Sequence, residues 1–254
     1  MTQLKAIIFD VDGTLAETER DGHRVAFNLA FSDAGLDWNW DEELYGQLLA
    51  VTGGKERIRY YLSEFNTDFQ AEGDLTSFIA SLHAEKTKYY VGLLESNAIA
   101  LRPGVVRLIN EIRSSGLRLA IATTTTPENV TALVTNTLGV EALDWFECIA
   151  AGDIVPAKKP AADIFVYCLE QMGLNADECI VFEDSANGVR SSCGAHIPTV
   201  VTLNNYTKDD DFSGAVSVLN HLGDDALACD VISGQNIKGS FVTVDDLKRF
   251  HAQQ

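Results

Sequence analysis

The sequence predicts an α/β fold, in which a sheet of mostly parallel strands is interrupted by a helical insertion. A short apolar run opens the chain, and after residue 103 apolar runs alternate with helical segments, which is the pattern of a parallel sheet. Residues 16–94 show helical spacing and no convincing strand. We therefore assign residues 1–15 and 95–254 to an α/β core domain and residues 16–94 to an inserted helical domain.

The first apolar run, residues 6–9, predicts a fully buried parallel strand. It ends at Asp10 and Asp12, which share one face because a single residue separates them. This edge of an open α/β sheet is where ligands bind. Two nearby carboxylates repel each other unless a cation lies between them, and Mg²⁺ is a natural occupant. A solvated turn would explain the same pair, so the later strands decide.

The insertion predicts about four amphipathic helices. Glu17, Arg20 and His23 lie within reach of the end of the first strand, although a solvated helix start is the simpler interpretation. Residues 52–56, Thr-Gly-Gly-Lys-Glu, predict a helix start whose free N–H groups, with Lys55, could hold an anion. A plain N-cap competes with that interpretation.

The second half of the chain predicts a regular alternation of elements. We expect strands at residues 117–122, 146–151, 179–183, 198–203 and 216–219, and helices at 105–115, 127–138, 161–171, 186–193 and 244–251. Pro127 suits the first position of its helix and Thr126 the N-cap.

Polar side chains recur where these strands end. Thr123 follows the second strand, and Pro160 holds Lys159 in an extended approach to the same edge. Glu183 and Asp184 end the fourth strand, which would crowd four carboxylates at one edge, and a bound metal resolves that conflict. A threonine that caps a turn and a lysine that decorates a loop are the alternatives.

Composition narrows the function classes. The chain has 254 residues, 46% of them hydrophobic, and a formal net charge of −18, which disfavours nucleic acid and anionic membranes as partners. A phosphate substrate remains compatible, because charges beyond about 8 Å are screened at physiological salt. Five cysteines without a C-x-x-C spacing predict reduced thiols. With no apolar stretch of membrane-spanning length, we expect a cytoplasmic protein, or a stromal one in a plant or alga.

Four motifs resemble those of the haloacid dehalogenase-like hydrolases, in order: D-V-D-G-T-L at Asp10, the strand-end Thr123, Lys159-Pro160, and E-D-S at Glu183. The resemblance implies a Rossmann-like, doubly wound parallel sheet core with an inserted α-helical cap, as in phosphoglycolate phosphatase and β-phosphoglucomutase. L-L-x-x-T-G-G-K-E-R, R-P-G-V and A-G-D-I-V-P-x-K-K-P are similar to CbbY-type proteins. Those are phosphatases that remove the inhibitory sugar xylulose 1,5-bisphosphate and so protect the carbon-fixing enzyme Rubisco.

The resemblance also implies catalytic roles. Asp10 would attack phosphorus to form an aspartyl phosphate, and Asp12 would protonate the departing sugar oxygen and later deprotonate water. Mg²⁺ would be held by the Asp10 carboxylate, the backbone carbonyl of Asp12, and Asp184, with Glu183 close by.

Substrate-binding roles follow from the same resemblance. Thr123 and Lys159 would hold the oxygens of the transferring phosphoryl group, with Thr124 also counted as substrate-binding. Closure of the cap would bring Glu17, Arg20, His23 and Lys55 over the sugar.

Two alternatives stay open at this point. A phosphosugar mutase would use the same aspartate but return the phosphoryl group to sugar, although Thr14 resembles the phosphatases more than the mutases. A non-catalytic regulatory module would retain the fold without turnover. We expect a small-molecule sugar phosphate as the partner and a monomer as the assembly.

Overall fold

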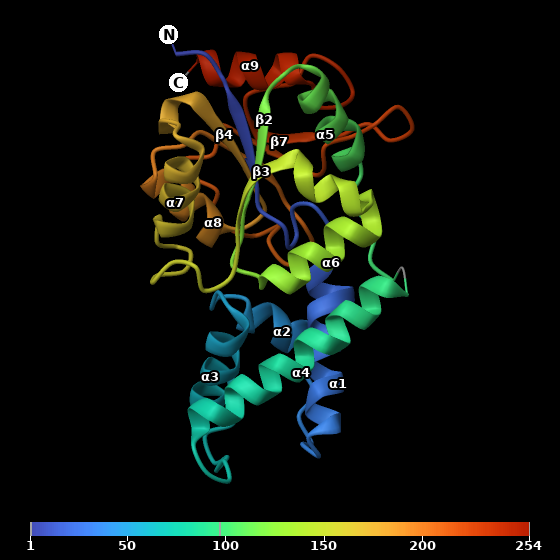
Figure 1. Ribbon diagram of the computed structural model, residues 1–254, viewed down its shortest axis with the longest axis vertical. Helices are drawn as coiled ribbons and strands as arrows, with labels where there is room; N and C mark the ends of the chain where they lie inside the picture. The colour runs from blue at the N-terminus through green and yellow to red at the C-terminus, as the bar shows by residue number, and fades with distance from the viewer. Residues whose placement is uncertain (1, 97, 254) are drawn as a thin grey trace.

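The computed structural model describes residues 2–96 and 98–253. Figure 1 shows an α/β part, which holds both ends of the chain, and a group of helices, α1–α4, that lies at the opposite end of the molecule. Within the described residues the sheet has seven strands in the order β3-β2-β1-β4-β5-β6-β7. The strands are β1 (Ala6–Phe9), β2 (Arg118–Ala122), β3 (Phe146–Ala150), β4 (Cys179–Glu183), β5 (Thr199–Thr202), β6 (Ser217–Leu219) and β7 (Val231–Gly234).

Strand β1 lies at the centre of the sheet because it pairs with β2 on one side and β4 on the other, in parallel. All four of its residues are buried, as its unbroken apolar sequence predicts. The register aligns Phe9 with Ile121 and with Phe182. The residues that follow these three therefore reach the same edge of the sheet, and this brings Asp10 beside Glu183.

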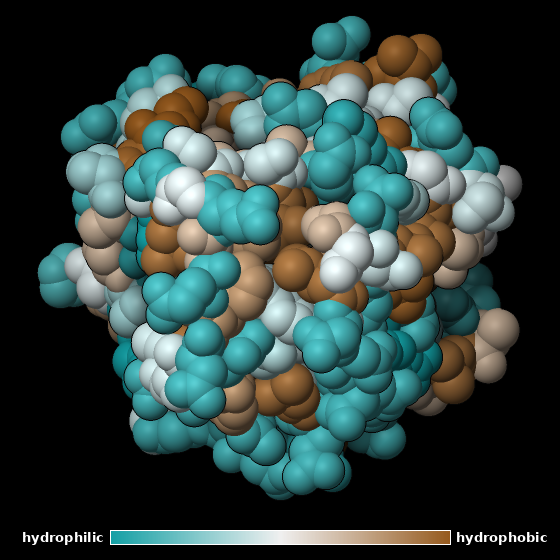
Figure 2. All heavy atoms as spheres, turned by 90° about the horizontal axis from the view of Figure 1, so that it is seen from below, coloured by the Kyte–Doolittle hydropathy of each residue, from teal (hydrophilic) through white to brown (hydrophobic). Residues whose placement is uncertain are grey.

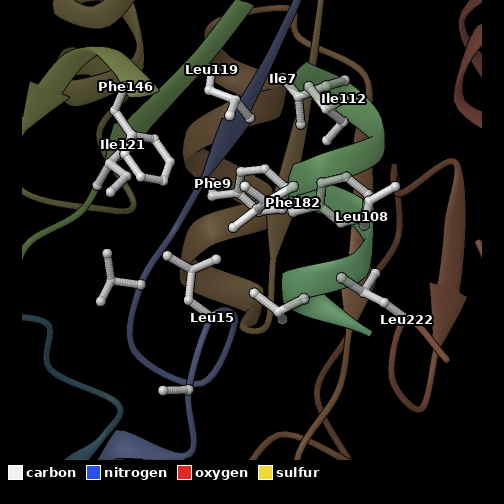
Figure 3. Packing of buried hydrophobic residues seen from close by; sticks show 14 of the residues in the cluster. Ile7, Phe9, Leu15, Leu108, Ile112, Leu119, Ile121, Phe146, Phe182 and Leu222 are labelled. Carbon is white, nitrogen blue, oxygen red and sulfur yellow. The ribbon is translucent and has the colours of Figure 1, made fainter. Parts of the chain in front are cut away.

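The flanking helices cover both faces of the sheet (Figure 1). They are α5 (Val105–Ser114), α6 (Pro127–Leu138), α7 (Asp163–Met172), α8 (Ala186–Gly194) and α9 (Val244–Ala252), with short 3₁₀ helices at Val140–Trp145 and Ala176–Glu178. Alternate residues of β1 face opposite layers: Ile7 and Phe9 pack in the cluster that contains α5, and Ile8 packs in the cluster that contains α7. Figure 3 shows Phe9 beside Phe182 in the first cluster, with ring centroids 5.0 Å apart.

Helices α1 (Arg24–Asp33), α2 (Glu42–Leu48), α3 (Gly54–Glu64) and α4 (Leu75–Glu95) have a hydrophobic core of their own. It is rich in aromatic side chains, among them Phe27, Trp38 and Trp40. Helix α4 extends beyond this core, because Ile79 packs within it whereas Tyr90 belongs to the cluster of the α/β part. The helical group is therefore joined to the sheet part along one continuous helix as well as through the chain crossings.

The predicted elements are confirmed with shifts of a few residues at their ends. Thr126 caps α6 and accepts a hydrogen bond from the Asn129 N–H, and Pro127 is the first helical residue. Two features were not predicted: a π-helix at Glu19–His23, which runs into α1, and the antiparallel strand β7. Three of the four β7 residues are exposed, so its sequence lacks the apolar alternation that marks a strand.

Other sequence expectations concern the surface and the thiols. The five cysteines are free, and four of them are buried. Among the described residues, no helix has both the length and the apolar character required to cross a membrane. Figure 2 views the molecule from the end formed by the helical group, where hydrophilic residues interrupt the hydrophobic areas.

Candidate active site

Three carboxylates meet at the carboxyl edge of the central strands. Asp10 follows β1, and Glu183 and Asp184 lie at the end of β4. Each of the three offers an oxygen, these atoms lie within 4.8 Å of one another, and all three residues are buried. The parallel register of β1 and β4 produces this cluster, as the two acid-ended strands predict.

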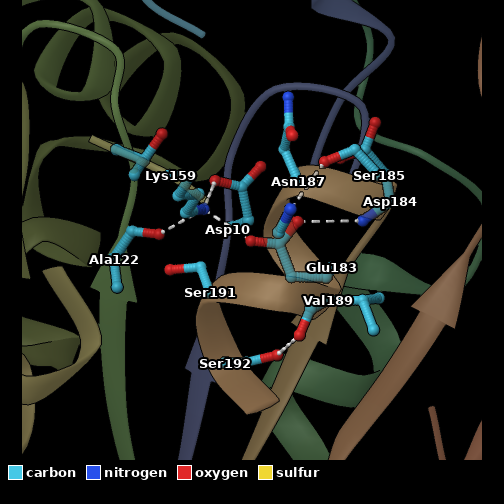
Figure 4. A network of polar contacts seen from close by, with 12 residues as sticks. Asp10, Ala122, Lys159, Glu183, Asp184, Ser185, Asn187, Val189, Ser191 and Ser192 are labelled. Carbon is cyan, nitrogen blue, oxygen red and sulfur yellow. Dashed lines mark hydrogen bonds and ion pairs between the residues drawn. The ribbon is translucent and has the colours of Figure 1, made fainter. Parts of the chain in front are cut away.

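Lys159 lies between two of these carboxylates (Figure 4). Its Nζ donates to Asp10 Oδ1 at 2.6 Å, to Glu183 Oε1 at 2.5 Å and to the Ala122 carbonyl at 3.1 Å. Burial would lower the pKa of Lys159, but the two carboxylates outweigh burial and hold its pKa above the usual range. The ammonium therefore remains charged at the floor of the site.

One lysine does not balance three buried carboxylates. Burial raises the pKa of Asp10 to about 8, with repulsion from Glu183 and Asp12 adding to it and Lys159 opposing it. Burial, with repulsion from Asp10 and Glu183, also raises the pKa of Asp184 well above its usual value. A divalent cation would relieve this crowding, and a set of carboxylate oxygens is the donor set that Mg²⁺ prefers. The residues present therefore fit a magnesium site.

Two glycines allow the chain to pass close to the acids. Gly13 has a φ of +78°, and a Cβ there would collide with the Asp184 carboxylate. A Cβ at Gly188, in α8, would collide with Glu183. Glycine is required at both positions by close approach, and at Gly13 by the backbone conformation as well.

Asp12 faces away from the cluster and toward the helical group. Its Oδ1 accepts hydrogen bonds from Thr18 Oγ1 at 2.6 Å and from His23 Nε2 at 2.8 Å. Lys86 Nζ lies 2.8 Å from the other ring nitrogen of His23. Burial would raise the pKa of Asp12, but His23 and Thr18 together bring it below its usual range.

Thr123 and Thr124 continue the same sheet edge. Thr123 is buried, and its N–H donates to the Ala150 carbonyl at 2.9 Å. Its Oγ1 accepts a long hydrogen bond from the Thr125 N–H at 3.3 Å. The structure therefore brings the two predicted threonines to the cavity that contains Asp10 and Lys159.

Two adjoining cavities open from this edge. The first, of about 400 Å³, contains the acidic cluster with Lys159 and Thr123. The second, of about 490 Å³, lies between the helical group and the sheet part and contains His23, Lys55 and Lys158. Both are lined by Asp12, Glu19, Arg57 and Thr124. The shared lining makes one elongated space with the acidic cluster at one end.

The predicted residues of the helical group have different positions. His23 lies at the site, through its contact with Asp12. Lys55, at the start of α3, lines the second cavity and pairs with Asp153. Arg20 pairs instead with its neighbour Asp21, at 2.8 Å, and is largely exposed.

Glu17 pairs with Arg102 Nε at 3.1 Å, so its carboxylate is held beside the buried guanidinium. Neither Glu17 nor Arg20 lines the two cavities. The structure does not bring these two predicted substrate-binding residues to the site, because each is engaged by a charged partner outside it.

Four lining or contacting residues were not predicted. Glu19 and Arg57 lie in the shared wall, and Arg57 Nη1 donates to Tyr45 Oη at 3.0 Å. Lys86 is buried in α4 four residues after Leu82, so a lysine within an apolar stripe was the signal that could have identified it. Asn204 follows β5 at the same sheet edge and donates to Asp184.

Comparison with known proteins extends this geometry. A family model described as haloacid dehalogenase-like hydrolase matches residues 4–192. Protein CbbY of Cupriavidus necator is 46% identical over 223 residues, 88% of this chain and 87% of that protein. Protein CbbY of Rhodobacter capsulatus is 49% identical over 213 residues, 84% of this chain and 91% of that protein.

A solved structure agrees with the two relatives. A CbbY mutant from Rhodobacter sphaeroides, crystallised in complex with xylulose 1,5-bisphosphate, is 43% identical and has a TM-score of 0.79, covering 88% of this chain and 98% of that one. Because the family model spans the strands that carry the site and CbbY proteins align along most of the chain, this protein is a phosphatase and belongs to the haloacid dehalogenase-like hydrolases.

Proposed function

We propose that this protein is a Mg²⁺-dependent phosphatase that removes one phosphate from xylulose 1,5-bisphosphate. The observation that carries the proposal is the elongated space, which runs from the acidic cluster with Lys159 to Lys55 and Lys158. A substrate with two charged ends matches a space with cationic side chains near both ends. The CbbY structure in complex with this sugar bisphosphate supports the choice of substrate.

Asp10 is the proposed nucleophile. Lys159 binds its Oδ1, which leaves Oδ2 to attack phosphorus and form an aspartyl phosphate. Mg²⁺ would be held by Asp10, Asp184, Glu183 and the backbone carbonyl of Asp12, and when bound it supplies positive charge that offsets the carboxylates and the phosphate. Asp10 then retains the anionic form that attack requires.

Asp12 is the proposed acid and base. Thr18 and His23 hold its carboxylate apart from the acidic cluster. Its low pKa suits the second half of the reaction, in which it takes a proton from the attacking water. The first half requires Asp12 to carry a proton, and the nearby dianionic phosphate favours this because a like charge raises the pKa of a carboxyl group.

Thr123, Thr124 and Lys159 are the proposed holders of the transferring phosphoryl group. All three line the cavity with Asp10, and Lys159 keeps its charge. A fixed ammonium and hydroxyl donors stabilise charge that spreads over the equatorial oxygens.

Residues 16–94 are the proposed cap domain. They carry the wall of the second cavity that faces the sheet part, including His23 and Lys55. Closure of such a cap excludes bulk water and completes the binding site. In this proposal Lys55 contacts the phosphate that is not transferred. Arg20 and Glu17 remain predicted substrate contacts that would require a rearrangement of their ion pairs.

Phosphate release from a panel of sugar monophosphates and bisphosphates tests the substrate. We expect xylulose 1,5-bisphosphate to have the highest kcat/KM, and excess EDTA to abolish turnover until Mg²⁺ is restored. A higher kcat/KM for a monophosphate such as glucose 1-phosphate would overturn the substrate assignment. A sugar phosphate that is isomerised without release of phosphate, detected by phosphorus NMR, would make the enzyme a mutase.

A further inference from the structure

Asn204 makes a contact at the acidic cluster that none of the family motifs includes. It follows β5, so it reaches the carboxyl edge from a third acid-site strand beside β4. Its Nδ2 donates to Asp184 Oδ2 at 2.7 Å, and Asn204 is buried. Among the described residues, this is the hydrogen bond that the structure gives to the Asp184 carboxylate.

The orientation of the Asn204 amide is fixed by its surroundings. Oδ1 accepts from the Tyr206 N–H at 2.9 Å, so the amide oxygen is already used. The backbone N–H of Asn204 donates to Thr207 Oγ1 at 3.0 Å. A flipped amide would place its NH₂ against a backbone donor and its oxygen against a carboxylate, and both contacts would be repulsive. Nδ2 must therefore face Asp184.

The strand end that carries Asn204 is itself held in place. Arg102 is buried, and its guanidinium donates to the carbonyls of Thr202 at 3.0 Å and Leu203 at 2.7 Å. The same guanidinium contacts the carbonyl of Gly13, in the turn after β1. This arrangement links the end of β5 to the turn that follows Asp12.

From this geometry we propose that Asn204 is a positioning residue that orients Asp184 to receive a divalent cation. The inference rests on the proposed metal site. A neutral amide suits the task because it fixes the carboxylate without cancelling its charge, whereas a second cation beside Lys159 would compete with the metal. Asn204 acts through Asp184 and needs no contact with the substrate.

The test measures Mg²⁺ binding by calorimetry on the substrate-free protein. Asn204→Ala should weaken Mg²⁺ affinity about ten- to a hundredfold, as the loss of an outer partner of a metal ligand usually does. Asn205→Ala is the matched control, because Asn205 is the exposed neighbour in the same loop and should leave the affinity unchanged. At saturating Mg²⁺ the kcat of Asn204→Ala should recover, and its KM should stay near that of the parent.

Thermal unfolding in EDTA checks that each variant is folded. Thr207→Val removes the oxygen that holds the Asn204 backbone but keeps the shape of the side chain, so it should cause a smaller loss of Mg²⁺ affinity in the same direction. This variant carries the test if Asn204→Ala does not fold.

Three results would overturn the inference. The first is a Mg²⁺ affinity for Asn204→Ala within about twofold of the parent, and the second is an equal loss in Asn205→Ala. The third is a parent protein that binds no Mg²⁺, which would also remove the metal from the proposed function. The first two leave the proposed phosphatase intact, so the two failures are distinguishable.

Discussion

Lys55, at the start of α3, forms an ion pair with Asp153, in the loop that follows β3. Lys158 extends the contact, because its Nζ lies 3.0 Å from Asp153 Oδ1 and 3.0 Å from Glu56 Oε2. Two residues of the helical group and two of the sheet part thus alternate in charge across the second cavity. A phosphate that binds Lys55 must therefore share this ammonium with Asp153 or displace the carboxylate.

Lys55→Ala should selectively damage turnover of a sugar bisphosphate. A hydrogen bond to a charged group contributes roughly 1.5–3 kcal/mol, so kcat/KM should fall about ten- to a hundredfold. A small aryl phosphate does not reach Lys55, and its turnover should barely change. Steady-state kinetics on both substrates provide the measurement, with Lys88→Ala as the control because Lys88 is exposed on α4. Parallel losses on the two substrates would remove Lys55 from the substrate site.

Asp153→Asn separates substrate binding from a closing contact. If Lys55 binds the second phosphate, removal of the competing carboxylate should lower KM for the bisphosphate and leave kcat for the aryl phosphate unchanged. If the ion pair serves only to hold the helical group against the sheet part, Asp153→Asn and Lys55→Ala should impair both substrates alike. Measurement of KM at low and high salt adds a check, since screening should weaken the surface pair and reduce the difference between variant and parent.

Asp10→Asn should abolish turnover and leave the fold intact. The amide retains the shape of the carboxylate but cannot act as an anionic nucleophile. Its loss of charge also reduces repulsion with Glu183 and Asp184, so thermal stability in EDTA should equal or exceed that of the parent. Phosphate release and thermal unfolding are the two measurements. A variant that still works at about a tenth of the parent rate would show that Asp10 is not the nucleophile.

The sequence allowed the sheet edge to be predicted well and the helical group much less. Asp10, Thr123 and Glu183 each follow an apolar run, and parallel strands deliver whatever follows them to one edge. That rule requires no knowledge of packing. Asn204 obeys it too, but it opens an acidic, loop-like stretch in which one amide does not stand out.

Helical positions are harder because the phase of each helix decides which side chains reach the site. Arg20 and His23 lie three residues apart at the start of the same segment, yet His23 contacts Asp12 and Arg20 pairs outward with Asp21. Lys86 reaches His23 from α4, 63 residues further along the chain. Such a contact between distant segments depends on how α1 and α4 pack, and local spacing does not contain that information.

The metal-free protein should lose stability as pH rises through the neutral range. The pKa of Asp10 is raised from its ordinary 3.8 to about 8 by burial and by the neighbouring carboxylates, and that of Asp184 is raised as well. The folded protein therefore retains protons that the unfolded chain releases above about pH 4. Because the folded state then binds more protons than the unfolded state, the free energy of unfolding falls between about pH 4 and pH 8.

Thermal unfolding in EDTA between about pH 5 and pH 8 measures this effect. The parent should lose more stability across the range than Asp10→Asn, which lacks one of the two titrating groups. Asp245→Asn removes a carboxylate that is 89% exposed on α9 and should follow the parent. Mg²⁺ should flatten the slope of the parent, because a bound cation favours the ionised carboxylates and replaces the protons that hold the cluster together. Equal slopes for the parent and Asp10→Asn would show that crowding at the cluster does not govern the pH dependence.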